Sequence, residues 1–265
     1  MKALKLPAVG RLIAISVAIL ICIANFAYAQ GYRGGKVGTV ILVHGAWADG
    51  SSWKEVIPRL EARGINVVAV QLPLSSLAND VATVQRAIAI APSPVILVGH
   101  SYGGAVITEA GNDPNVIGLV YVAAFAPDAG ESTMTLNALY PPSPVVADHL
   151  IAPDAEGYLK LLPEGILSDF AEDLPVREKT TLIATQGPIT ATALDTPITT
   201  AAWRTKPSWF IIAKRDRIIQ PKLEEFESQR MHAVTSVADS CHVIMLSKPE
   251  HVTDVISGAM RSLDR

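Results

Sequence analysis

Mostly apolar runs with no polar face alternate along the chain with segments whose apolar residues fall three or four positions apart. The apolar runs predict buried strands at residues 37–43, 66–70, 95–98, 116–124, 208–213 and 233–238. The helical spacing predicts helices at about 53–63, 77–91, 102–111, 221–232 and 249–263. Strands that are apolar on both faces are typical of a mostly parallel sheet covered by helices on each side. We therefore expect an α/β fold.

The alternation stops after Phe125 and resumes at residue 208. The stretch from 127 to about 206 is rich in Pro, Thr and Asp and contains short amphipathic pieces around 158–162 and 166–174. An excursion of about 80 residues is long for a connecting loop, and long excursions within compact domains are usually lids or binding elements. We interpret this stretch as a cap inserted into a single domain that spans residues 30–265.

The first 29 residues have the pattern of a secretory signal peptide. A basic start precedes an apolar run at 12–24, and the small-x-small sequence at 27–29 is typical of a cleavage site. The alternative is a transmembrane anchor, but this run has 13 residues, whereas a spanning helix needs about 20. We expect cleavage between Ala29 and Gln30, a secreted or periplasmic protein, and no stable membrane anchor after processing.

Composition limits the partners of the exported chain. With 49% hydrophobic and 18% charged residues, the 265-residue chain can bury one substantial core. Removal of the signal peptide changes the net charge from −3 to −6, and an acidic protein is a poor candidate for nucleic-acid binding. Cleavage also removes Cys22, and Cys241 cannot form an internal disulfide by itself. The core must therefore stabilise the fold without a covalent cross-link.

A Gly-x-Ser-x-Gly pattern lies where the strand at 95–98 meets the following helix. A sharp strand-to-helix turn of this kind holds a serine hydroxyl clear of the sheet edge. Gly99 and Gly103 fall where the strand and helix backbones come too close for a Cβ atom. Ser101 is therefore the candidate nucleophile, and the adjacent His100 is expected to point away from the hydroxyl.

A serine hydroxyl needs a general base near neutral pH, and that base needs an orienting acid. Asp216 follows the strand at 208–213, and His242 lies in the turn after the last strand. Both positions are at carboxyl ends of strands, where open α/β sheets place their sites. His251 is the alternative base, but it lies in the last predicted helix and is expected to face solvent. We predict a triad of Ser101, Asp216 and His242.

Acyl transfer also requires hydrogen-bond donors for the developing oxyanion. The first donor is the backbone N–H of Tyr102, the residue after the nucleophile. The second is expected from the loop after the first strand, where Gly45 allows the backbone to turn so that the Ala46 N–H points at the site. The sequence has no His-Glu-x-x-His motif and no paired cysteines, so neither a metal nor another cofactor is predicted.

Four motifs in order give the chain a specific resemblance to a known family. They are Val-His-Gly-Ala-Trp at 43–47, Gly-His-Ser-Tyr-Gly-Gly at 99–104, Asp216 before the Ile-Ile-Gln-Pro sequence at 218–221, and His-x-x-x-Leu-Ser-x-Pro at 242–249. Together they resemble the α/β-hydrolase superfamily, and within it the small bacterial esterase-like branch akin to plant methylesterases and hydroxynitrile lyases. The resemblance implies that His242, which opens its motif, is the catalytic histidine.

Departures from the family pattern narrow the chemistry. Hydroxynitrile lyases of this branch have a lysine after the catalytic histidine and a threonine beside the oxyanion loop, whereas this chain has Val243 and Gly45. Cyanohydrin cleavage is therefore not expected. Ser101 also excludes the chemistry of the dehalogenases and epoxide hydrolases of the superfamily, which use an aspartate at the elbow.

The predicted function is hydrolysis of small carboxylic esters through an acyl-enzyme, with a small-molecule ester as substrate. Perhydrolysis, lactone hydrolysis and carbon–carbon bond hydrolysis on the same triad remain alternatives, as does a ligand-binding protein that keeps the fold without catalysis. Aromatic residues of the oxyanion loop and the insertion are candidates for lining the substrate pocket, namely Trp47, Tyr140, Tyr158, Phe170 and Trp203. The alternative for each of them is packing of the cap on the core.

Overall fold

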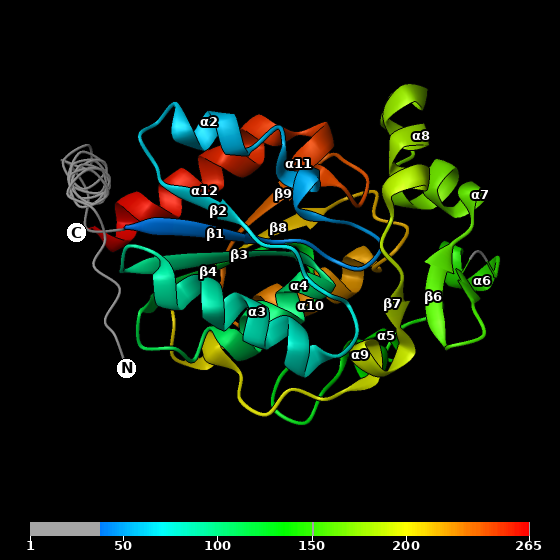
Figure 1. The fold of residues 1–265 in the computed structure, drawn as a ribbon, viewed down its shortest axis with the longest axis horizontal. Helices are drawn as coiled ribbons and strands as arrows, with labels where there is room; N and C mark the ends of the chain where they lie inside the picture. The colour runs from blue at the N-terminus through cyan, green and yellow to red at the C-terminus, as the bar shows by residue number, and fades with distance from the viewer. Residues whose placement is uncertain (1–37, 150, 265) are drawn as a thin grey trace, which may run out of the picture. The chain divides into compact units, whose positions relative to one another are not determined.

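The computed structural model describes residues 38–149 and 151–264, which are built on a six-stranded sheet (Figure 1). Its strands are β1 (Thr39–Val43), β2 (Val67–Ala69), β3 (Val95–Ser101), β4 (Val116–Ala124), β8 (Ser208–Ala213) and β9 (Val234–Ala238). Their order is β2-β1-β3-β4-β8-β9, and every neighbouring pair is parallel. The carboxyl ends of all six strands therefore meet at one edge of the sheet.

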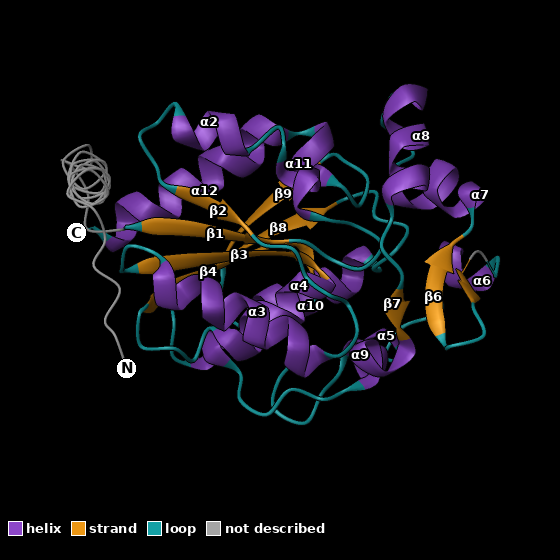
Figure 2. Ribbon diagram, in the orientation of Figure 1, coloured by secondary structure: helices purple, strands orange, loops and turns teal. Residues whose placement is uncertain are grey.

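Helices cover both faces of the sheet (Figure 2). One face carries α2 (Ile57–Glu61), α11 (Ile244–Ser247) and α12 (Pro249–Leu263), and the other carries α3 (Leu77–Ile90), α4 (Tyr102–Ala110) and α10 (Pro221–Arg230). Every residue of β1, β3 and β8 is buried, as expected for strands covered on both faces. The predicted α/β fold with helices on each side is confirmed.

The last helix shows how the sequence pattern produces this packing. Val252, Ile256, Ala259 and Met260 recur at helical spacing, are buried, and lie on a helix that contacts β4 and β8. Full burial of a side chain such as Ile256 contributes about 1.5–3 kcal/mol to stability. The exposed positions between them keep the outer face of α12 in water.

The predicted helix at 53–63 is shorter in the structure, where α2 covers residues 57–61. A 3₁₀-helix, η1 (Gly50–Trp53), precedes α2, and Pro58 stands in the first turn of α2. Proline is tolerated there because the missing N–H would have no acceptor within the helix. Helix α11 was not predicted, since four residues are too few to show a helical period.

In the insertion between β4 and β8, the described residues form elements of two to ten residues. They are α5 (Thr133–Asn137), α6 (Pro144–Ala147), β5 (Ile151–Pro153), β6 (Tyr158–Leu161), α7 (Pro163–Gly165), the π-helix η2 (Ile166–Phe170), α8 (Val176–Thr185), β7 (Ile189–Thr190), α9 (Ala191–Asp195) and the 3₁₀-helix η3 (Ala202–Arg204). Strands β5, β6 and β7 form an antiparallel sheet of their own. The sequence did not predict this second sheet.

The predicted signal peptide and its cleavage site lie outside the described residues. Within the part of the chain that the structure describes, no helix is long and apolar enough to cross a membrane.

Candidate active site

Ser101 ends β3 and stands directly before α4. Its backbone has φ 54° and ψ −126°, a conformation that is strained for a residue with a side chain. A Cβ atom at Gly103 would lie 2.6 Å from the carbonyl oxygen of His44, so only glycine allows α4 to approach the end of β1 this closely. The strand, the strained serine and the helix together have the geometry of a nucleophile elbow.

Asp216 and His242 form a buried pair at the same edge of the sheet. Nδ1 of His242 lies 2.5 Å from Oδ2 of Asp216, and both side chains are fully buried. The other carboxylate oxygen accepts the N–H groups of Ile218 and Ile219 at 2.7 and 2.9 Å, which fixes the carboxylate in place. Because an ionised carboxylate only accepts, Nδ1 carries the proton and Nε2 is left as an acceptor. Among the described residues, this Nε2 has no hydrogen-bond partner.

His100 connects the elbow to the loop that carries His242. Its ring lies 4.6 Å from the His242 ring, and its Nε2 donates to the backbone carbonyl oxygen of His242 at 3.1 Å. Burial, and then the neighbouring His242, hold the pKa of His100 well below its usual value, so the imidazole is neutral. This contact could not be predicted from the sequence, because a contact between residues this far apart along the chain has no local pattern.

The loop after β1 lies against the nucleophile. A Cβ atom at Gly45 would lie 2.6 Å from Cβ and 3.2 Å from Oγ of Ser101. The ring of His44 holds this loop, since its Nε2 accepts the N–H of Leu72 at 2.9 Å and its Nδ1 donates to the carbonyl oxygen of Gly45 at 2.9 Å. Burial lowers the pKa of His44, which keeps the ring neutral for these two bonds.

The two predicted oxyanion donors are backbone N–H groups in the loop after β1 and at the start of α4. Within residues 38–149 and 151–264, the backbone N–H groups of Ala46 and Tyr102 donate to no other residue. The Tyr102 N–H is also at the N-terminus of α4, where unpaired N–H groups and the helix dipole favour a negative charge. The chemistry of this corner therefore suits an oxyanion.

The side chain of Tyr102 holds the elbow to α3. Its hydroxyl donates to Oδ2 of Asp80 at 2.8 Å, and Oδ1 of Asp80 accepts the N–H of Leu74 at 2.8 Å. Burial raises the pKa of Asp80 to about 6. Asp80 gave no signal in the sequence, where it is one polar residue in an amphipathic helix.

Helix α10 brings two buried carboxyl groups to the ends of β8 and β4. Glu224 accepts the N–H of Ala213 at 3.0 Å, and Glu227 accepts that of Ala126 at 2.6 Å. Burial, and then the charge of Asp216, raise the pKa of Glu224 well above its usual value, and burial raises that of Glu227 to about 8. Glu227 is therefore largely neutral at pH 7, and the raised pKa of Glu224 favours the neutral form of the carboxyl group beside Asp216.

Two of the five predicted pocket residues, Phe170 and Trp47, connect the insertion to the candidate site. The ring of Phe170 lies 5.3 Å from that of His242, and the indole of Trp47 donates to the carbonyl oxygen of Leu159 in β6 at 3.0 Å. These two contacts join the insertion to the His242 loop and to the oxyanion loop. Tyr140 and Tyr158 are half-buried side chains of the insertion itself.

Trp203 has packing contacts instead. Its indole donates to the carbonyl oxygen of Pro127 at 2.9 Å, and the guanidinium groups of Arg204 and Arg230 lie 5.1 and 5.5 Å from the ring centroid. The structure gives it no polar or ring contact with Ser101 or His242. Of the two roles considered for Trp203, these contacts favour packing of the insertion where it rejoins the core.

His251 is placed away from the buried acid–base pair. It lies on α12, and its Nε2 is 3.1 Å from the hydroxyl oxygen of Ser236 in β9. The expectation that it faces solvent was wrong in part, because this contact leaves it half-buried. The carboxylate of Asp216 is occupied by His242 and not by His251.

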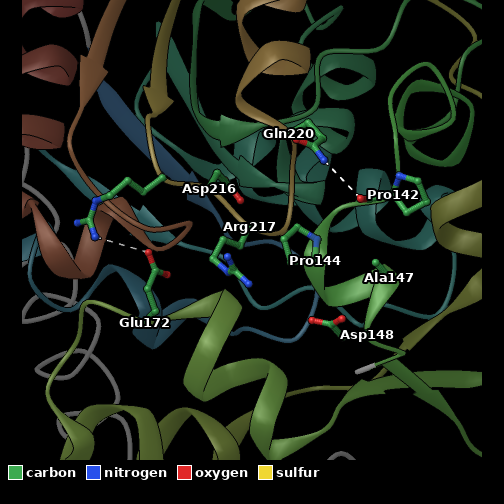
Figure 3. A pocket seen from close by; sticks show the side chains of 9 residues that line it. Pro142, Pro144, Ala147, Asp148, Glu172, Asp216, Arg217 and Gln220 are labelled. Carbon is green, nitrogen blue, oxygen red and sulfur yellow. Dashed lines mark hydrogen bonds and ion pairs between the residues drawn. The ribbon is translucent and has the colours of Figure 1, made fainter.

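A cavity of about 670 Å³ is lined in part by Asp216 (Figure 3). Arg217, Gln220 and Asp148 are among the residues that line it, whereas Ser101 and His242 are not. This cavity therefore borders the acid of the pair and not the nucleophile. In the described part of the chain, no three His, Cys, Asp or Glu side chains come together in a way that could hold a metal ion.

Comparison with known proteins identifies the family. Residues 40–254 match the model of the alpha/beta hydrolase family, and the chain belongs to this family. A pyrethroid hydrolase from Sphingobium wenxiniae is 32% identical over 157 residues, which are 54% of each protein. The resemblance that the four motifs indicated is thereby confirmed.

Solved structures share the fold. A pyrethroid hydrolase from Sphingobium faniae JZ-2 superposes with a TM-score of 0.73 at 24% identity, over 84% of this chain and 96% of that one. Polyneuridine aldehyde esterase gives a TM-score of 0.71 at 18% identity, over 84% of this chain and 99% of that one. At these identities the likeness concerns the fold alone.

Proposed function

We propose that this protein is a serine hydrolase that cleaves small carboxylic esters through an acyl-enzyme. The observation that carries the proposal is the buried Asp216–His242 pair at the sheet edge where the Ser101 elbow ends. Nε2 of His242 has no hydrogen-bond partner in the described part of the chain. The curated relative named a pyrethroid hydrolase supports ester hydrolysis as the reaction class.

Each residue has a defined step in this mechanism. Nε2 of His242 takes the proton of the Ser101 hydroxyl as Oγ attacks the ester carbonyl carbon, and Asp216 stabilises the imidazolium that forms. The N–H groups of Ala46 and Tyr102 bind the oxyanion of the tetrahedral intermediate. His242 then gives its proton to the leaving alkoxide, so that an alcohol departs and an ester bond to Ser101 remains. Water, deprotonated by His242, hydrolyses that bond and releases the acid.

Covalent labelling tests the proposal and separates a catalyst from a ligand-binding protein with the same fold. Purified protein should react with a fluorophosphonate at Ser101 and should hydrolyse a short-chain aryl ester. Ser101→Ala should fold normally, take no label and lose about 10⁴- to 10⁶-fold in turnover, since removal of one triad member costs about this much. A Ser101→Ala enzyme with a near-normal rate would refute the assignment.

We also propose that the mature protein is exported. The support is the N-terminal pattern of a basic start, a short apolar run and a small-residue cleavage site before Gln30.

A further inference from the structure

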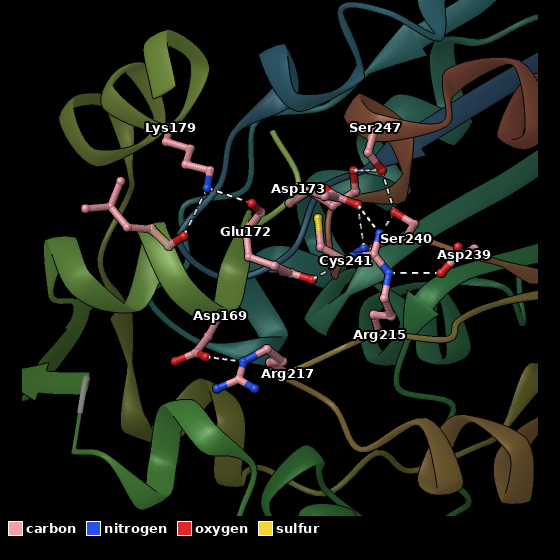
Figure 4. Close-up of polar contacts among 12 residues, drawn as sticks. Asp169, Glu172, Asp173, Lys179, Arg215, Arg217, Asp239, Ser240, Cys241 and Ser247 are labelled. Atoms are coloured by element: carbon pink, nitrogen blue, oxygen red, sulfur yellow. Dashed lines mark hydrogen bonds and ion pairs between the residues drawn. The ribbon is translucent and has the colours of Figure 1, made fainter. Parts of the chain in front are cut away.

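Residues 169–173 of the insertion, which we name the bracing segment, contact the loops that carry Asp216 and His242 (Figure 4). The segment starts within η2 and ends before α8. Two of its carboxylates, Asp169 and Asp173, reach one loop each. The reaction described above assigns no role to either of them.

The first contact fixes the loop of the acid. Oδ1 of Asp169 lies 2.5 Å from Nε of Arg217, the residue directly after Asp216. The Asp169 side chain is fully buried, whereas that of Arg217 is 44% exposed. A buried carboxylate that loses its cation leaves an uncompensated charge, so breaking such a pair is costly. The buried Asp169 carboxylate therefore holds the Arg217 side chain against the insertion.

The second contact fixes the loop of the base. Oδ2 of Asp173 accepts the backbone N–H of Cys241, the residue directly before His242, at 2.9 Å. The same oxygen lies 3.1 Å from Nη2 of Arg215. Hydrogen bonds to an ionised acceptor are about twice as strong as those between neutral groups. Asp173 thus fixes the backbone at Cys241, immediately before His242.

Phe170 lies between these two carboxylates in the sequence and contacts the base itself. Its ring is 5.3 Å from the His242 ring and tilted by 55°, within the range of favourable aromatic pairs. This contact limits rotation of the imidazole on the side of the insertion. His100 binds the backbone carbonyl oxygen of His242 separately.

The bracing segment is also bound by α8. The ammonium group of Lys179 in α8 donates to the carbonyl oxygens of Leu167 and Glu172, at 3.1 and 2.7 Å (Figure 4). These two bonds fix the backbone before and within the bracing segment. The bracing segment therefore has contacts of its own with α8, in addition to those with the two loops.

We propose that Asp169 and Asp173 are positioning residues, which hold Arg217 and Cys241 so that the Asp216–His242 pair faces Ser101. This inference rests on the proposed function. A misplacement of about 1 Å at a reacting group can cost about 10²-fold in rate. The rate should therefore depend on these carboxylates, although neither is a catalytic residue.

The test compares Asp173→Ala, Asp173→Asn and Asp239→Asn on a short-chain aryl ester. Alanine removes the acceptor for the Cys241 N–H and should lower kcat about 10- to 100-fold, with KM within about threefold. Asparagine keeps an oxygen acceptor and should restore kcat to within about fivefold of the wild type. Asp239 is the matched control, because it contacts the same Arg215 at 2.9 Å but not Cys241. Its variant should stay within about twofold of the wild type.

A second pair of variants tests the acid loop and covers the case in which Asp173→Ala does not fold. Arg217→Gln should lower kcat about 5- to 10-fold with KM unchanged, since the loop loses its tie to Asp169. Arg204→Gln, which removes the exposed pair with Asp128 instead, should have the wild-type rate. Each rate is divided by the concentration of sites that a fluorophosphonate labels, so misfolded protein does not lower the rate per site.

The outcomes separate this inference from the proposed function. Equal rates per labelled site for Asp173→Ala and Asp239→Asn, and for Arg217→Gln and Arg204→Gln, would overturn the positioning role. A rise in KM at constant kcat would overturn it as well. Failure of the wild type itself to label at Ser101 would instead refute the serine hydrolase.

Discussion

Nε2 of His100 lies 3.1 Å from the backbone carbonyl oxygen of His242, so one buried bond joins the nucleophile elbow to the loop of the base. His100 directly precedes Ser101 in the sequence, and His242 follows Asp216 by 26 positions. The elbow and the loop of the base are therefore joined directly by a buried hydrogen bond.

This bond should contribute to stability. His100→Leu removes the donor and leaves a buried carbonyl oxygen unpaired, which costs about 1–3 kcal/mol. We expect the urea midpoint of unfolding to fall accordingly and kcat to fall with it. An unchanged midpoint would show that the bond contributes nothing to the fold.

The two candidate histidines should behave differently. His242→Ala should reduce turnover of an aryl ester about as much as Ser101→Ala, because it removes the group that the Asp216 carboxylate orients. The double variant should be little worse than either single variant, since residues that act as one unit are strongly non-additive. His251→Ala, the control, loses only a contact with Ser236 and should keep most of the activity. An active His242→Ala beside an inactive His251→Ala would overturn the choice of base.

The strands and the elbow could be predicted from the sequence because their signals are local. The run from Val95 is apolar on both faces, and the glycines around Ser101 mark a close backbone approach. The position of Asp216 could likewise be inferred, because a strand end fixes the edge of the sheet to which a side chain belongs.

Other features of the site depend on contacts between distant residues and could not be predicted in the same way. Asp169 pairs with Arg217, which lies 48 positions further along the chain, and the sequence around either residue has no pattern that predicts the pair. The strands of the small sheet have two to four residues, too few for an alternating pattern to stand out. The sequence therefore predicts only a short amphipathic piece around Tyr158, which begins β6 in the structure.

The exported form should begin at Gln30. The prediction follows from the small residues at 27–29 and from an apolar run too short to span a membrane. Intact-mass measurement of protein from the native host tests it, with material from the periplasm or medium compared with the membrane fraction. A membrane-bound chain that retains Met1 would favour an anchor instead.

Glu227 should make stability fall with rising pH. Burial raises its pKa to about 8 in the folded protein, against the bond from Ala126 and the charge of Arg230, which lower it. An unfolded glutamate has its ordinary pKa of about 4.3, so the folded state binds the additional proton between these two values. The stabilisation is therefore complete below about pH 4 and is lost as the pH rises towards 8.

Glu227→Gln isolates this effect, because glutamine keeps an oxygen for the Ala126 N–H and cannot ionise. Glu224, whose pKa is also raised, is present in both proteins, and the charge of Glu227 is the smallest of the causes of its shift, so most of its effect cancels in the comparison. Between pH 6 and pH 9, the free energy of unfolding of the wild type should fall by about 2–3 kcal/mol more than that of the variant. Urea unfolding at the two pH values measures this difference. Parallel losses in the two proteins would show that Glu227 is already ionised at pH 6. The assignment of a neutral Glu227 carboxyl group at the end of β4 would then be wrong.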